Sequence, residues 1–163
     1  MKKEDKQQFT RRITQANSTE LVVILYEMLL CYLEDAENAL KTLEKPSPEE
    51  GAFREAVRNA RGCLLELVNS LDLRYEPAAE LQRLYMFCIR RLAISGLRKE
   101  DGPLDEIRRV IEPLRDAYRQ VAAQNPAGPV MNNSQSVYVG LTYGRNTLTE
   151  NMADQGANRG ILA

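Results

Sequence analysis

NSTELVVILYEMLLCYLEDAENALKTLE, residues 17–44, contains the longest apolar run of the chain and is the main evidence for its fold. Apolar side chains recur in it at every third or fourth position, which is the period of one face of an α-helix. Asn17 and Glu20 have the spacing of a capping box, with asparagine in place of the usual serine or threonine. These signals predict a helix that follows Asn17, runs to about Glu44 and ends before Pro46. The periodic apolar positions are Leu21, Leu25, Met28, Tyr32, Ala36, Ala39 and Leu43.

The same stretch is more apolar than one buried face requires. From Leu21 to Leu33, twelve of thirteen residues are apolar, and Glu27 is the exception. The sequence LYMFCI at residues 84–89 repeats this excess. A helix that is apolar on most of its circumference is either central in its fold or covers its second face with a partner, and four-helix bundles have no central helix. We therefore expect a hydrophobic docking groove for helices of another polypeptide; the alternative is an irregular core with a homodimer contact.

A second helix is predicted from SPEE, residues 47–50, because Ser47 is a suitable cap, Pro48 suits the first helical position and Glu50 completes the box. Its apolar face comprises Phe53, Val57, Ala60, Leu64, Leu67 and Leu71.

A third helix is predicted to begin near Pro77, and its pattern loosens at Ser95 and Gly96. A fourth is predicted to begin at Pro103, with Pro113 bending it rather than ending it, because the apolar period continues beyond the proline.

These elements predict an all-α fold, an antiparallel up-down four-helix bundle with a short N-terminal cap segment and an irregular C-terminal tail. Helices of about twenty residues with short connections favour antiparallel neighbours around a shared core. The expected boundaries are 1–17 for the cap segment, 18–125 for the bundle and 126–163 for a flexible tail. Within the tail, VYVGLTYG at 137–144 is unusually apolar, so strand pairing or docking in a groove is the alternative to disorder.

The composition argues against catalysis. The chain has no histidine, which removes the commonest general base and metal ligand. Glu27, Glu66 and Asp72 lie beside buried positions, but a di-metal bundle also needs Glu-x-x-His pairs. The formal net charge is -1, and the arginine doublet Arg90 and Arg91 is typical of a solvated helix face. We expect no enzyme activity, no metal, no cofactor and no nucleic-acid partner.

The compartment is expected to be the cytoplasm. The opening residues MKKEDKQQ are not followed by the apolar stretch of a signal peptide, and the run 21–33 is shorter than the ~20 residues that span a bilayer. Cys31, Cys63 and Cys88 lie in separate apolar patterns and are interpreted as small buried residues in a reducing environment. No membrane association is predicted.

The segment QQFTRRITQAN, residues 7–17, places Phe9 and Ile13 one helical turn apart in otherwise polar surroundings. A short amphipathic piece at this point could lie over the groove and shield it when the partner is absent. The alternative is a fraying terminus.

Several motifs follow one another over roughly residues 9–120. They are FTRRIT at 9–14, STELVVILYE at 18–27, ELVNSLD at 66–72, the Leu-x-x-Leu-Tyr and Arg-Arg-Leu pattern within 81–92, and PLRDAY at 113–118. In this order they resemble the FliS family of flagellar secretion chaperones. The sequence departs from the family where Phe9 stands for the usual tyrosine and Tyr118 for the usual tryptophan.

The resemblance implies a cytosolic export chaperone that binds the disordered C-terminal region of flagellin, prevents premature polymerisation and presents cargo to the flagellar export apparatus. It also implies that the segment carrying Phe9 and Ile13 caps the groove in the free state. The alternative function is a helical regulatory or scaffold protein that uses the same surface for dimerisation or for another cytosolic partner. The residues expected at the partner-binding surface are Phe9, Ile13, Leu21, Val22, Leu25, Tyr26, Leu29, Leu81, Tyr85 and Ile89.

Overall fold

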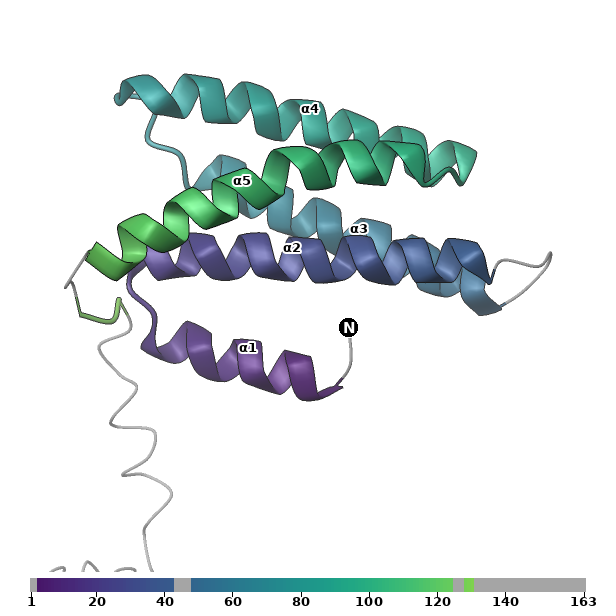
Figure 1. Cartoon of the computed structure of the whole chain (residues 1–163), viewed down its shortest axis with the longest axis horizontal. Helices are drawn as coiled ribbons and strands as arrows, with labels where there is room; N and C mark the ends of the chain where they lie inside the picture. The colour runs from purple at the N-terminus through teal and green to yellow at the C-terminus, as the bar shows by residue number, and fades with distance from the viewer. Residues whose placement is uncertain (1–2, 43–47, 125–127, 131–163) are drawn as a thin grey trace, which may run out of the picture. The chain divides into compact units, whose positions relative to one another are not determined.

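The computed structural model describes residues 3–42, 48–124 and 128–130, and in these ranges the chain is all-α. A short N-terminal helix precedes four longer helices that pack against each other (Figure 1). The predicted fold class is therefore confirmed. The predicted tail motif at 137–144 lies outside the described residues. The helices are α1 (Lys3–Gln15), α2 (Ser18–Lys41), α3 (Pro48–Asn69), α4 (Glu76–Arg98) and α5 (Gly102–Gln124).

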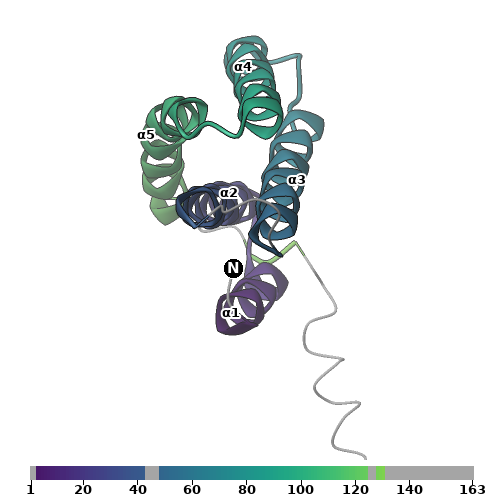
Figure 2. The same cartoon turned by 90° about the vertical axis from the view of Figure 1, so that its right-hand side faces the viewer.

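The four longer helices form a ring in which α2 and α4 each pack against both α3 and α5 (Figure 2). Successive helices from α2 to α5 run in alternating directions, as their short connections require (Figure 1). α1 packs against α2, on the side of α2 away from α4 (Figure 2). The largest fully buried side chains of the core are Tyr26, Leu29, Leu33, Phe53, Leu64, Leu67, Tyr85, Cys88, Leu92, Leu104, Ile107 and Ile111.

The predicted start of α2 is correct in detail. The side-chain Oδ1 of Asn17 accepts a hydrogen bond from the Glu20 N–H at 2.9 Å, and Glu20 Oε2 accepts one from the Asn17 N–H at 2.8 Å. α2 ends at Lys41, earlier than the predicted Glu44, and the Thr42 hydroxyl donates to the Asn38 carbonyl at 3.2 Å. The exposed carbonyls of the last turn are thus partly satisfied by a side chain.

The predicted loosening of the third helix at Ser95 and Gly96 is wrong, because α4 continues to Arg98. Ser95 is fully buried, and its hydroxyl donates to the Glu100 carbonyl at 2.7 Å. A Cβ at Gly96 would lie 3.4 Å from Val57 of α3, so α3 and α4 lie close together at this glycine. The helix ends where Lys99 adopts a left-handed conformation with φ 57°.

The fourth predicted helix bends at its proline, as expected. α5 passes through Pro113 without a break, and its axis changes direction about halfway along its length (Figure 1). A proline inside a helix removes one hydrogen bond and clashes with the preceding turn, which accounts for the bend.

Two of the three cysteines are buried as predicted. Burial raises the pKa of the Cys63 thiol to about 11 and that of Cys88 to about 12. Cys31 is only half-buried, because it lies beneath α1 rather than in the main core. All three are free thiols.

Candidate partner-binding surface

α2 has two apolar faces on roughly opposite sides. Tyr26, Leu29 and Leu33 point into the core shared by α2 to α5. Ile24 and Met28, one turn apart, point the other way and are covered by α1. This second face explains the excess of apolar residues between positions 21 and 33.

We call the contact between α1 and this second face the cap interface. Phe9 of α1 is 9% exposed and Ile24 of α2 is 2% exposed, so both are buried by the contact. Ile13 lies one turn after Phe9 and packs on the same cluster. The predicted amphipathic segment is therefore an ordered helix in the structure. The apolar members of the cap interface are Phe9, Ile13, Ala16, Leu21, Ile24, Met28 and Cys31.

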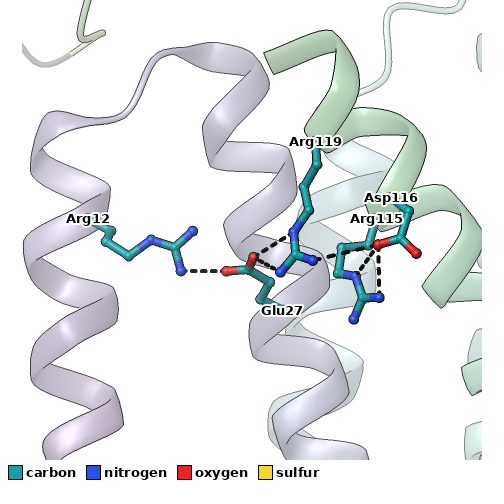
Figure 3. A network of polar contacts seen from close by, with 5 residues as sticks. All are labelled: Arg12, Glu27, Arg115, Asp116 and Arg119. Atoms are coloured by element: carbon teal, nitrogen blue, oxygen red, sulfur yellow. Dashed lines mark hydrogen bonds and ion pairs between the residues drawn. The ribbon is translucent and has the colours of Figure 1, made fainter. Parts of the chain in front are cut away.

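A carboxylate beside the cap interface joins three helices (Figure 3). Glu27 Oε2 accepts a hydrogen bond from Arg12 Nη1 of α1 at 2.5 Å, and its Oε1 accepts one from Arg119 Nη2 of α5 at 2.6 Å. The Glu27 side chain is 13% exposed. Burial alone would raise the pKa of Glu27, but the bonds from the two guanidinium groups outweigh it and hold the pKa below its usual value. Glu27 therefore stays ionised and ties α1 to α2.

The chain beyond α5 returns to the same region. The Val130 N–H donates to the Ala16 carbonyl at 3.1 Å, at the junction between α1 and α2. This bond satisfies a backbone acceptor at the point where the chain must turn from one helix into the next.

At one end of the bundle, residues from the starts of α2 and α4 and from the ends of α3 and α5 line an apolar hollow that we call the end pocket. Its volume is about 280 Å³. Behind it the hydroxyls of Tyr26 and Tyr85 are hydrogen bonded to each other, and Tyr118 stacks edge-on against Tyr26 with ring centroids 5.5 Å apart. Burial raises the pKa of Tyr85 to about 12, so the cluster is neutral at physiological pH. The pocket is lined by Val22, Ser70, Leu71, Asp72, Tyr75, Pro77, Ala78, Leu81, Tyr85 and Tyr118.

The ten residues predicted at the surface divide into groups. Leu29 and Tyr26 are fully buried in the core and line neither the cap interface nor the end pocket. Leu25 lies one turn from Leu21 and from Val22, partly buried between the cap interface and the end pocket. Phe9, Ile13 and Leu21 lie in the cap interface. Val22, Leu81 and the buried Tyr85 line the end pocket. Ile89 of α4 is partly buried and packs against the main core.

Several residues of these surfaces were missed from the sequence. Ile24 and Met28 follow a second helical phase of α2, and tracing that phase separately would have found them. The partners of Glu27 could not have been found in this way, because Arg12 and Arg119 lie 15 and 92 residues away.

The carboxylates at these two surfaces are bound to arginines. Glu27, considered above as a metal ligand, is bound to two arginines, and the Asp72 side chain is bound to Arg74 at 2.6 Å. Within the ranges that the structure describes, no group of three or more Cys, Asp or Glu side chains could hold a metal ion. Among these same residues, no helix is long and apolar enough to cross a membrane. The two surfaces are suited to contact with apolar side chains.

The sequence of the chain matches a known protein family. Residues 1–125 match the model of the family described as flagellar protein FliS. The chain is similar to the flagellar secretion chaperone FliS of Bacillus subtilis (strain 168), with 24% identity over 108 residues, covering 66% of this chain and 77% of that protein. The match extends from α1 to the end of α5 and so includes both the cap interface and the end pocket.

Proposed function

Because the chain belongs to the FliS family of flagellar secretion chaperones, which is non-enzymatic, we propose that it binds the disordered C-terminal region of flagellin. Binding takes place in the cytosol before secretion. It keeps flagellin from polymerising and holds it ready for the flagellar export apparatus.

The observation that supports this proposal is the cap interface. The second apolar face of α2 is covered by a helix of thirteen residues, of which six are charged. An isolated helix of this length is marginal in water, so α1 depends on its contact with α2 for its order. It contributes two large apolar side chains, Phe9 and Ile13, to that contact. A cover held by so few contacts can be displaced by a segment with more apolar side chains to bury.

Displacement leaves a continuous apolar strip for the cargo. Leu21, Ile24 and Met28 lose their cover, while Leu25 connects them to the end pocket. The pocket, about 280 Å³ in volume, accepts one large apolar side chain beside the Tyr85 ring. The cargo loses conformational entropy when it becomes helical, and burial of apolar surface along the strip offsets that loss.

The Glu27 carboxylate beside the strip keeps one ion-pair partner when α1 leaves. Glu27 loses Arg12 but keeps its bond to Arg119 of α5, so no buried carboxylate is left without a partner. The bundle therefore stays intact in the cargo-bound form.

A polymerisation assay tests the proposal. Flagellin from the same organism is seeded with filament fragments, with and without an equimolar amount of this protein, and elongation is followed by light scattering. We expect elongation to be suppressed, and we expect a soluble one-to-one complex on size-exclusion chromatography. Flagellin that lacks its C-terminal region is the control and should form no complex. Unimpeded elongation, with this protein eluting alone as a dimer, would favour the scaffold alternative.

A further inference from the structure

The outer side of α3 and α4 carries a groove that belongs to neither of the surfaces described so far. α3 and α4 lie side by side, and α1 lies on the opposite side of α2 from α4 (Figure 2). Part of the groove is a hollow of about 260 Å³. The hollow is lined by Phe53, Arg54, Val57, Arg58, Arg61 and Gly96.

The floor of the groove is apolar. Gly96 has no side chain, which leaves Val57 accessible from the groove, and Phe53 closes the bottom. Each of the two helices also carries a large exposed apolar side chain. Leu65 of α3 is 42% exposed, and Leu97 of α4 is 84% exposed. Single exposed apolar side chains are ordinary on a protein surface, so these two support a docking face only together with the hollow and the basic wall.

The wall contributed by α3 is basic. Arg54, Arg58 and Arg61 are exposed and spaced at i, i+4 and i+7, so their guanidinium groups follow one side of the helix for about 10 Å. In the part of the chain that the structure describes, neither Arg58 nor Arg61 forms an ion pair. Leu65 continues the same row one turn farther along.

The carboxylates near this wall do not neutralise it. Glu50 accepts hydrogen bonds from Arg54 at 2.7 Å and from Lys99 at 3.0 Å, so its single charge is shared between two cations. Glu55 lies on the other side of α3, where it lines a separate hollow together with residues of α1 and α2. The whole chain has a formal net charge of -1, so the basic wall is a local concentration of charge.

We propose that this groove docks an amphipathic, acidic helical segment of a partner protein, independently of the surface beneath α1. Apolar residues of the segment at helical spacing lie over Val57, Leu65 and Leu97. Carboxylates one turn apart along its flank face Arg58 and Arg61 and set its orientation. The apolar floor favours a polypeptide over a nucleic acid, because Phe53 is fully buried and offers no face for a base to stack on.

Two synthetic peptides test this docking on the full chain. One has about 18 residues, with leucines at helical spacing and glutamates on both flanks, and the other replaces every glutamate with lysine. Affinities are measured by fluorescence anisotropy, and the site is mapped by amide chemical shifts. We expect the acidic peptide to bind at least tenfold more tightly, with shifts concentrated at residues 54–65 and 86–97. The preference should weaken as salt is raised.

Charge reversal provides the decisive variant. Arg58→Glu combined with Arg61→Glu should invert the preference between the two peptides, since both side chains are exposed and their reversal leaves the core intact. The matched control is Arg109→Glu combined with Lys41→Glu, which makes the same change in net charge at exposed positions on α5 and α2 and should retain the preference for the acidic peptide.

Three results would overturn the proposal. They are equal affinity for the two peptides, shifts centred on α1 and α2, and an unchanged preference after reversal of Arg58 and Arg61. A single-stranded RNA oligonucleotide of the same charge is tested in parallel. If it binds as tightly as the acidic peptide through the same arginines, the groove is a nucleic-acid surface instead.

Discussion

Replacing Phe9 with alanine should loosen α1 without unfolding the bundle. The Phe9 side chain is 9% exposed, and it is buried against α2 outside the core shared by the four longer helices. Burying a phenylalanine side chain contributes about 2 kcal/mol. The substitution should therefore weaken the docking of α1 by about that amount. The packing of α2 to α5 should stay unchanged.

The consequence for cargo follows from competition. If flagellin binds the face that α1 covers, only the open fraction of molecules is available, and the apparent dissociation constant rises as that fraction falls. A loss of about 2 kcal/mol in docking free energy corresponds to about 30-fold in the closed-to-open ratio. Phe9→Ala should therefore strengthen binding of a flagellin C-terminal peptide, by up to about 30-fold if the cap is predominantly closed.

Two measurements together check this prediction. Hydrogen exchange should show that the amides of residues 3–15 lose protection while those of α2 to α5 keep it, and fluorescence anisotropy should show the tighter binding. Val121→Ala is the control, because Val121 is an exposed apolar residue of α5, 54% accessible to solvent. Loss of protection in α1 with unchanged or weaker peptide binding would refute competition between α1 and the cargo.

Three further outcomes are expected. The pKa of Glu27 is held below its ordinary value of 4.5, so its stabilisation of α1 is fully present above pH 4.5 and is lost as the pH falls through the lowered value. The protection of the α1 amides against hydrogen exchange, taken relative to the intrinsic exchange rate at each pH, should fall over this acidic range, and Glu27→Gln should remove most of that pH dependence; an identical dependence in the variant would contradict it. Tyr85→Phe leaves the buried hydroxyl of Tyr26 without its partner, which should cost about 1–3 kcal/mol in urea unfolding, and a cost near zero would show that the bond is dispensable. Gly96→Ala should stabilise the protein by up to about 1 kcal/mol, because helix propensity improves and the new Cβ meets Val57 at an ordinary contact distance of 3.4 Å; a destabilised variant would show that the helices cannot accommodate a methyl group.

The helix starts could be predicted because their signals are local. The capping box of Asn17 and Glu20 and the proline at position 48 each act within one turn of the chain, so a single sequence contains the whole interaction. Ser95 and Gly96 were misinterpreted because the partners of both lie outside their own helix. The Ser95 hydroxyl satisfies the Glu100 carbonyl after the helix end, and Gly96 packs against Val57 of another helix.

The surface was predictable in kind but not residue by residue. Periodicity showed that α2 is too apolar for one buried face, and the structure has a second face under α1. Periodicity could not show which apolar residues of α2 enter the core. Tyr26 and Leu29 were therefore assigned to the surface, although both are fully buried. The ion pairs of Glu27 join segments that are far apart in the chain, and no local pattern records them.

Above all, we propose that this protein binds the C-terminal region of flagellin and that this region becomes helical on binding. The most direct test is calorimetric titration of the protein with a peptide from that region of its own organism's flagellin, with circular dichroism recorded on the same samples. We expect saturable one-to-one binding, a gain in helicity and a negative heat-capacity change from buried apolar surface. Absence of binding at tens of micromolar, with the protein folded and monomeric, would contradict it.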